Sequence, residues 1–407
     1  MTNGVIHGQA LEKQPTLNLS GRIPELDGLR GVAIGLVLLC HFFFLVIQVR
    51  PGSAAAYLLT IGRLTWSGVD LFFVLSGFLI GGILLDARDS SNYFRVFYTR
   101  RFFRIVPIYV VLLASVGITF HLWRAGFIGK FEKIFLAPLP WPTFAVFVQN
   151  FAMVKRNDVG VFPLGVTWSL AVEEQFYLTL PLVVRFLDRR ALLRFILIGV
   201  AAAPLLRAFF FYRDPTNVFS WYTLMPCRAD SLLLGVLGAI ALRDPGWRAW
   251  LLGHRRFMSL ALMFFLVGTA LLGWRWPNLD RPLMAIAGLT WLALTYLSFL
   301  LYALLFPESW MSRCLRWGWL RGLGVIAYGT YLFHEFFLSL FFRRLPWISS
   351  WRDLGVSVLV LAFTLLFCRL SWLYFEKPLV KLGHRTSYNF DSKQSNTAVA
   401  PLATEGN

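Results

Sequence analysis

The sequence predicts an all-α protein, a polytopic transmembrane helical bundle of about ten spans with both termini in the cytosol. Of its 407 residues, 57% are hydrophobic and 15% are charged, whereas a soluble domain carries about a quarter charged residues. Apolar runs long enough to cross the roughly 30 Å hydrocarbon core recur along the chain, and each can satisfy its own backbone hydrogen bonds only as a helix. Trp and Tyr residues gather near the ends of these runs, as interfacial anchors do.

Ten runs are predicted to span the membrane, the one at 226–242 being weaker than the rest. They lie near 32–49, 67–85, 105–122, 168–187, 192–211, 226–242, 257–274, 283–306, 322–342 and 353–373. The apolar run 143–154 is too short to span and is interpreted as a re-entrant or interfacial segment of an external loop.

The net charge of +18 is distributed in short Lys and Arg clusters between apolar runs. This pattern fits the positive-inside rule and contact with anionic lipid, so we expect membrane lipid and no nucleic acid as a partner. With the N-terminus inside, the inward segments hold the larger share of these cations. The chain then divides into a polar cytosolic segment at 1–21, a transmembrane domain at 22–380 and a cytosolic tail at 381–407, whose polar composition predicts disorder.

The first span offers a pair of functional candidates, Arg30 and His41. The eleven-residue spacing is nearly a whole number of helical turns and covers about 16 Å, so both side chains project from one helix face. Such a face suits a ligand with an anionic head and a long arm, as in acyl-coenzyme A. The alternative is that Arg30 ends the helix at the interface and His41 makes a hydrogen bond between helices.

A second candidate lies at the start of the third span, where Arg101 and Arg104 are three residues apart. On a helix they share a face and could clamp a phosphate. The alternative is an ordinary positive-inside cluster.

The fourth span carries adjacent acids, Glu173 and Glu174, about two turns from its start. Ionisable groups inside a span are costly and indicate function. Adjacent side chains diverge on a helix, so we expect one carboxylate to face the bundle. Glu174, three residues before Tyr177, could line a cavity with it.

His334 lies in the ninth span. Measured from the outer span ends, His41, Ser76, Glu174 and His334 fall at similar depth, which predicts a polar layer in the middle to outer half of the bundle.

No metal site is predicted. Glu335 has no second His at the spacing of a metalloprotease motif, and the four Cys residues are scattered. Asp70, Arg228 and Asp230 could line an external entrance or pair at helix ends.

Five motifs in order resemble the acyltransferase 3 family. They are LDGLRG with a His eleven residues past the Arg, GVDLFFVLSGFLI at 68–80, RRFFRIVP at 100–107, WSLAVEEQFY at 168–177 and YGTYLFH at 328–334. The resemblance covers about residues 22–380 and implies ten spans in a bacterial cytoplasmic membrane. It also implies transfer of an acyl group, often acetyl, from cytosolic acyl-coenzyme A to a hydroxyl of a carbohydrate-containing acceptor such as surface polysaccharide, lipopolysaccharide or a glycolipid.

The resemblance assigns its Arg-x10-His motif to Arg30 and His41, and its Arg-x-x-Arg motif to Arg101 and Arg104. Its acid matches Glu174, although Gln175 before the Phe-Tyr pair leaves the choice between the two adjacent glutamates open.

The expected mechanism uses the three arginines to bind the phosphates of acyl-coenzyme A, a co-substrate rather than a tightly bound cofactor. His41 then acts as general base or carries the acyl group itself, and Glu174 or His334 orients the imidazole or the acceptor. Some family members carry a fused external domain. None is evident in this sequence, so a separate periplasmic acyl-transfer protein is an expected partner.

A transporter or flippase with mid-membrane His and Glu as a proton relay is the rival hypothesis. It accounts for the buried ionisable groups but leaves the arginines at the cytosolic mouth unexplained.

Overall fold

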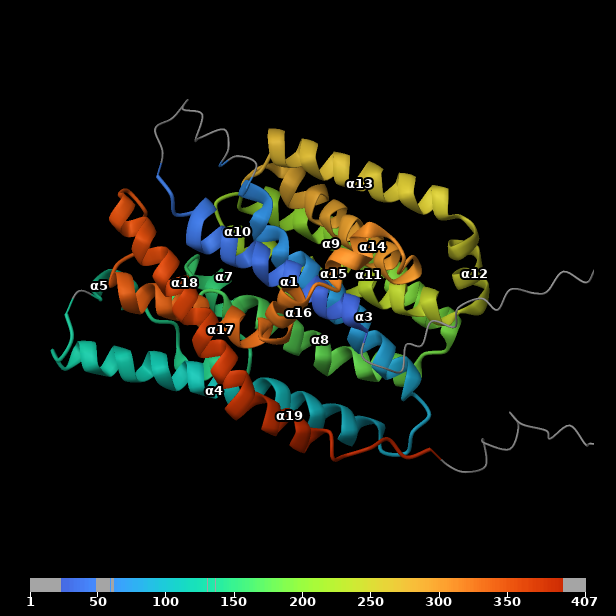
Figure 1. The fold of residues 1–407 in the computed structure, drawn as a ribbon, viewed down its shortest axis with the longest axis horizontal. Coiled ribbons are helices and arrows are strands. Elements are labelled where there is room, and N and C mark those ends of the chain that lie inside the picture. The colour runs from blue at the N-terminus through green and yellow to red at the C-terminus, as the bar shows by residue number, and fades with distance from the viewer. Residues whose placement is uncertain (1–22, 49–58, 60–61, 130, 136, 391–407) are drawn as a thin grey trace, which may run out of the picture.

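The computed structural model describes residues 23–48, 59, 62–129, 131–135 and 137–390, and over these ranges the chain is helical apart from turns, loops and one isolated bridge between Ile47 and Ile348. Long helices run side by side along the longest axis of the molecule (Figure 1). The predicted N-terminal segment 1–21 lies outside the described residues, as does the predicted tail 381–407 from residue 391 onward. The first residues of that tail differ from the predicted disorder, because 381–383 end the helix Lys377–Gly383 and the Thr386 carbonyl accepts two hydrogen bonds from Arg100.

The long elements correspond to the predicted spans. They are α1 (Pro24–Leu39) with the π-helix η1 (Cys40–Phe44), α3 (Gly68–Asp86) preceded by η2 (Gly62–Ser67), α4 (Tyr93–Arg124), α8 (Thr167–Phe186), α9 (Arg189–Arg213), α11 (Met225–Arg243), α13 (Arg255–Arg275), α14 (Leu289–Leu305) preceded by the π-helix η4 (Met284–Gly288), α17 (Ala327–Phe342), and α18 (Trp351–Ser371) continued by η5 (Trp372–Glu376) and α19 (Lys377–Gly383). Shorter helices connect them: α5 (Glu132–Phe135), α6 (Trp141–Ala145), α7 (Gln149–Arg156), η3 (Phe162–Leu164), α10 (Val218–Tyr222), α12 (Pro245–Gly253), α15 (Trp310–Leu315) and α16 (Gly318–Val325).

Eight helices of the described residues are long and apolar enough to cross a membrane. A ninth span results if α16 and α17, which meet at an angle of 71°, are counted together. The remaining predicted span is α8, whose 20 residues reach about 30 Å but include the polar run Glu173–Gln175. The all-helical membrane fold is therefore confirmed, while the count of ten and the cytosolic termini stay predictions.

The apolar run 143–154 does not form a continuous helix. It is divided between α6 and α7, with Phe147 between them at a positive φ of 56°. The eight residues of α7 extend only about 12 Å, too short to cross the hydrocarbon core.

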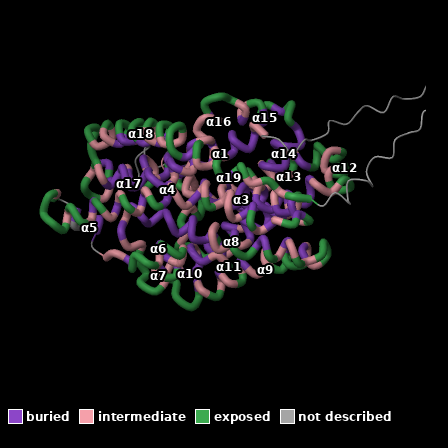
Figure 2. The backbone as a smooth tube through the Cα atoms, turned by 90° about the horizontal axis from the view of Figure 1, so that it is seen from below, coloured by how far each residue is buried: buried purple, intermediate pink, exposed green. Residues whose placement is uncertain are grey.

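Two helices, α3 and α11, form the centre of the bundle. Their most apolar stretches are 78% and 72% buried within the protein, against 17% for α13 at the periphery, and Figure 2 shows the buried backbone concentrated around α3, α11 and α1. A Cβ atom added at Gly77 would lie 1.8 Å from the carbonyl oxygen of Leu232, and one at Gly235 would lie 2.2 Å from that of Val74. Small residues thus bring the two backbones into contact, as is common between membrane helices.

Loops at one end of the bundle are tied together by charged side chains. Arg243 makes two hydrogen bonds to Asp86 at 2.6 and 2.7 Å, and Arg88 donates to the carbonyl oxygen of Leu187 at 2.6 Å. This end therefore holds the α3–α4, α8–α9 and α11–α12 connections in one layer.

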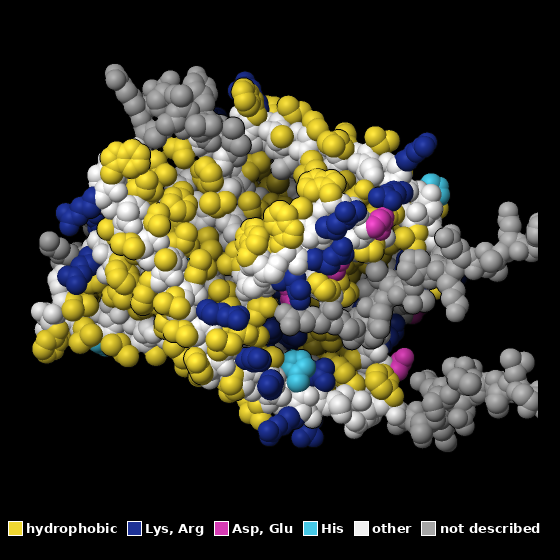
Figure 3. Space-filling view, in the orientation of Figure 1, with side chains coloured by type: hydrophobic (Ala, Val, Ile, Leu, Met, Phe, Trp, Pro, Cys, Tyr) yellow, Lys and Arg dark blue, Asp and Glu magenta, His cyan; other side chains and the backbone are white. Residues whose placement is uncertain are grey.

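Hydrophobic side chains cover much of the face seen in Figure 3, whereas Lys and Arg gather over α12, α15, α16 and α19. The apolar belt is what lipid contact requires, with cations toward the predicted cytosolic end.

Replacing Gly77 with Val should destabilise the folded protein by about 3 kcal/mol or more, because the new side chain meets backbone that cannot move aside. Thermal unfolding of the purified protein in detergent measures the effect. The matched control is Gly355→Ala on α18, where a Cβ meets no atom within 4 Å. Equal melting temperatures for Gly77→Val and the control would contradict the packing described for α3 and α11.

Candidate functional site

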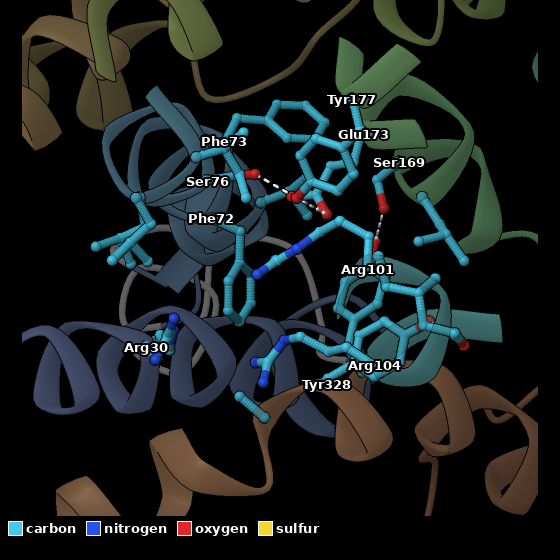
Figure 4. Close-up of a pocket in the computed structure, with 18 of the residues that line it drawn as sticks. Arg30, Phe72, Phe73, Ser76, Arg101, Arg104, Ser169, Glu173, Tyr177 and Tyr328 are labelled. Atoms are coloured by element: carbon cyan, nitrogen blue, oxygen red, sulfur yellow. Dashed lines mark hydrogen bonds between the residues drawn. The ribbon is translucent and has the colours of Figure 1, made fainter. Parts of the chain in front are cut away.

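A cavity of about 310 Å³ opens between α1, α3, α4, α8 and α17. Its wall combines three arginines with aromatic, hydroxyl and carboxyl groups. These polar and aromatic lining residues are Arg30, Phe72, Phe73, Ser76, Arg101, Arg104, Ser169, Glu173, Tyr177, Tyr328, Tyr331 and His384. Figure 4 shows the arginines reaching into the cavity from α1 and α4, opposite the polar group of α8.

Close helix contacts place the arginine of α1 on this wall. A Cβ at Gly31 would lie 2.1 Å from the carbonyl oxygen of Leu320, so α16 packs directly against the backbone of α1. Arg30, next in sequence, turns to the cavity and bonds Asp27 at 3.2 Å. Glycine at position 31 thus supports the orientation of Arg30.

Arg101 and Arg104 project from one face of α4, as their spacing predicts. The Nε atom of Arg101 is buried and has no hydrogen-bond partner among the described residues. Guanidinium groups held together in a partly buried cavity repel one another, and an anion with several oxygens would relieve that repulsion. The three arginines predicted from the sequence, Arg30, Arg101 and Arg104, therefore do line one cavity.

On α8, the acid that lines the cavity beside Tyr177 is Glu173 and not the expected Glu174. Tyr177 donates a hydrogen bond to Glu173 at 3.2 Å and shares one with Ser76 at 2.5 Å. Glu173 lines the cavity, whereas Glu174 does not, and the Oε1 atom of Glu174 is buried without a partner among the described residues. The predicted cavity pair of Glu174 and Tyr177 is therefore wrong, because the rotation of α8 favours the four-residue spacing over the three-residue one.

A second cluster joins the two candidate histidines. The rings of His41 and His334 are 4.8 Å apart between centroids and inclined by 70°. His41 Nε2 lies 3.4 Å from Glu335 Oε1. His334 and Glu335 are almost wholly buried, and the His41 side chain is 22% exposed. The structure thus brings together residues almost 300 positions apart in sequence.

Backbone carbonyls fix the proton positions in both rings. His41 Nδ1 lies 3.0 Å from the carbonyl oxygen of Val37, and His334 Nδ1 lies 2.7 Å from that of Tyr331. A carbonyl oxygen can only accept, so each Nδ1 carries hydrogen and each neutral ring keeps its lone pair on Nε2. Both histidines therefore offer a basic nitrogen to the cluster.

His41 sits in the π-helix η1 rather than in a regular turn of α1. The π-helical turn is held by α18, because the Ser357 hydroxyl donates a hydrogen bond to the carbonyl oxygen of Phe42 at 3.0 Å. Such π-turns are frequent at functional sites. The regular helical spacing used to align His41 with Arg30 consequently ends before His41.

Tyr331 separates the cavity from the histidine cluster. It lines the cavity, its hydroxyl bonds Ser169 at 2.6 Å, and its ring centroid is 5.8 Å from that of His334, one helical turn further along α17. The predicted polar layer is thus divided. Ser76 lines the cavity, whereas His41 and His334 lie outside its lining, on the other side of Tyr331.

Glu335 was not assigned a functional role by the sequence. Its position next to His334 was the available signal, but its contact with His41 depends on how α1 and α17 pack.

The external residues form ion pairs inside the protein. Arg228 contacts Asp70, and Arg207 bonds Asp230 at 2.9 Å, with all four side chains fully buried. Pairing, the second of the two alternatives, is what the structure shows for Asp70 and Arg228.

No solved structure matches the chain. A Staphylococcus aureus (strain COL) relative, named provisionally as an O-acetyltransferase, is 27% identical over 383 residues, which cover 89% of this chain and 58% of the relative. Peptidoglycan O-acetyltransferase OatA of Listeria monocytogenes is 27% identical over 386 residues, covering 89% of this chain and 56% of OatA. O-acetyltransferase OatA of Staphylococcus aureus (strain MRSA252) is 26% identical, covering 92% and 60%.

The chain thus spans less than two thirds of the length of these relatives. A family model described as an acyltransferase domain matches residues 23–375. This range includes the histidine cluster and every lining residue of the cavity except His384, and it covers nearly all of the described residues. The chain therefore belongs to the acyltransferase 3 family, whose acyl-transferring class the sequence motifs predicted.

Proposed function

We propose that the protein is a membrane O-acetyltransferase of the bacterial cytoplasmic membrane. It moves an acetyl group from cytosolic acetyl-coenzyme A to a hydroxyl of a cell-surface polysaccharide, and the name of the Listeria relative makes peptidoglycan the first acceptor to test. The observation that carries the proposal is the cavity with Arg30, Arg101 and Arg104, which ends one helical turn from paired histidines. The family assignment favours this enzyme over the transporter hypothesis.

The charge of the cavity wall suits the donor. The three arginines supply the cationic mouth that phosphate groups require. The pantetheine arm would extend past Ser76 and Tyr177 toward Tyr331, at the inner wall. Movement of Tyr331 away from Ser169 would then give the thioester access to His41.

The cluster supplies the base for acyl transfer. His41 Nε2 accepts the proton of the acceptor hydroxyl while the hydroxyl oxygen attacks the thioester carbonyl carbon. The bond between carbon and sulfur breaks, and the coenzyme A thiolate leaves. The imidazolium formed at His41 faces Glu335, whose carboxylate stabilises the positive charge at the 3.4 Å separation. His334 Nε2 can accept a hydrogen bond from a second, neighbouring hydroxyl of the sugar and so orient the acceptor.

A polysaccharide hydroxyl that does not reach His41 requires a carrier of the acetyl group. The proposal therefore includes a separate periplasmic acyl-transfer protein as a partner. It would receive the group from the outer end of the bundle.

Arg101→Ala should weaken the binding of acetyl-coenzyme A by about tenfold or more, because a hydrogen bond to a charged group contributes about 1.5–3 kcal/mol. Isothermal titration with the purified protein measures the dissociation constant. Arg95→Ala, on the same helix but exposed and outside the cavity lining, is the control. If Arg101→Ala binds acetyl-coenzyme A as tightly as the unchanged protein, Arg101 would be only part of a positive-inside cluster that sets membrane orientation.

His41→Ala should lower kcat for acetyl transfer by at least about 100-fold while donor binding persists, since removal of a general base costs about 100-fold to 10,000-fold. Glu335→Gln should lower kcat less, by about tenfold, because the base remains and only its charge partner is lost. Transfer of radiolabelled acetyl groups to peptidoglycan fragments is the assay. Full activity of a correctly inserted His41→Ala protein would refute the central role of His41.

The donor mouth should face the cytosol. Arg190 and Arg213 stand near opposite ends of α9, so Arg190→Cys should react with a membrane-impermeant maleimide only after permeabilisation, and Arg213→Cys already in intact spheroplasts. Cys314→Ser serves as background, since the other three native cysteines are buried. The reverse labelling pattern would place the cavity mouth outside and exclude a cytosolic donor.

A further inference from the structure

We propose that His41, His334 and Glu335 bind one divalent transition-metal ion of zinc-like chemistry, and that the bound ion inhibits acyl transfer. The ion would occupy the lone pair through which His41 accepts a proton. Inhibition rests on the proposed function, whereas metal binding stands on the geometry of the cluster alone.

The ligand atoms have nearly the separations that a tetrahedral ion requires. One ring nitrogen from each histidine and a carboxylate oxygen of Glu335 all lie within 4.8 Å of one another. Bonds of about 2.1 Å to a tetrahedral Zn²⁺ place neighbouring ligand atoms about 3.4 Å apart. The His41 to Glu335 separation is 3.4 Å. The widest separation needs to shorten by only about 1.4 Å, which side-chain rotation can provide.

The surroundings orient both histidines as metal ligands are oriented. A ligating histidine donates its other ring N–H to a carboxylate or a backbone carbonyl. His41 and His334 do so to Val37 and Tyr331, which directs both Nε2 lone pairs away from the backbone. The carboxylate of Glu335 accepts a hydrogen bond from the backbone of Val166. All three ligands are thus held by the main chain.

An unpaired nitrogen favours a metal ion over a shared proton. His334 Nε2 is buried and has no hydrogen-bond partner among the described residues, and His334 is fully buried. A proton shared by His41 and Glu335 would satisfy those two acceptors and leave His334 Nε2 unsatisfied, at a cost of about 1–3 kcal/mol. A cation coordinated by all three satisfies every acceptor at once.

The cluster also leaves a coordination position open. His41 is partly exposed, whereas His334 and Glu335 are buried. Two histidines and one glutamate are a ligand set that binds Zn²⁺ with a free fourth position. Among the described residues, this is the one group of three or more His, Cys, Asp or Glu side chains with metal-binding separations.

The binding test uses full-length protein purified in detergent, stripped with EDTA and desalted. Titration calorimetry with Zn²⁺ and absorption spectroscopy with Co²⁺ should each show one ion per chain, the Co²⁺ spectrum having the intense visible bands of a tetrahedral site. His334→Asn and Glu335→Gln should each weaken binding at least tenfold. Circular dichroism and size-exclusion chromatography check that both variants remain folded.

The matched control is His121→Asn, which removes an exposed histidine near the end of α4, away from the cluster. It should bind Zn²⁺ as the unchanged protein does. Absence of stoichiometric binding, or equal weakening in all three variants, would overturn the proposed site.

An activity measurement separates binding from inhibition. Stoichiometric Zn²⁺ should abolish acetyl transfer, and EDTA should restore it. Activation by Zn²⁺ would overturn the inhibitory role. Stoichiometric binding to a protein without transferase activity under any condition would leave the metal site standing and refute the proposed function instead.

Discussion

The cost of holding ionisable groups away from water governs this structure. Arg228 and Asp70 meet that cost by pairing with each other, as do Arg207 and Asp230, and all four are fully buried. These pairs link α3 with α11 and α9 with α11, and the opposite charges in each pair offset one another. Groups that lack a protein partner are therefore the informative ones.

Two adjoining places hold unpaired buried groups beside a cavity or a cluster of titratable side chains. Around the cavity, buried Arg101 Nε has no acceptor in the part of the chain that the structure describes, so the cationic wall is open to an anion. Around the histidines, basic atoms converge without a donor, so that region is open to a proton or a metal ion. Tyr331 lies between the two and contacts both. This division suits a long donor whose charged head and reactive end require different surroundings.

Competition between a proton and a metal ion follows from the same geometry. The backbone carbonyls that fix the tautomers of His41 and His334 make each Nε2 an acceptor. An acceptor that is basic enough to take a proton from a hydroxyl is also a ligand for Zn²⁺. The features that prepare the cluster for catalysis therefore expose it to inhibition by metal.

The sequence by itself determined the helical membrane fold, because apolar runs in lipid can satisfy their backbone hydrogen bonds only as helices. It also identified Arg101 and Arg104 as neighbours at the cavity, because residues three apart share a helix face. Only the tertiary structure decided that Glu173 rather than Glu174 faces that cavity, since the rotation of a helix depends on its neighbours. The partnership of His41 with Glu335 was equally beyond sequence analysis. It requires α1 and α17 to meet at one depth, and that depth is set by close packing between helices distant in the chain.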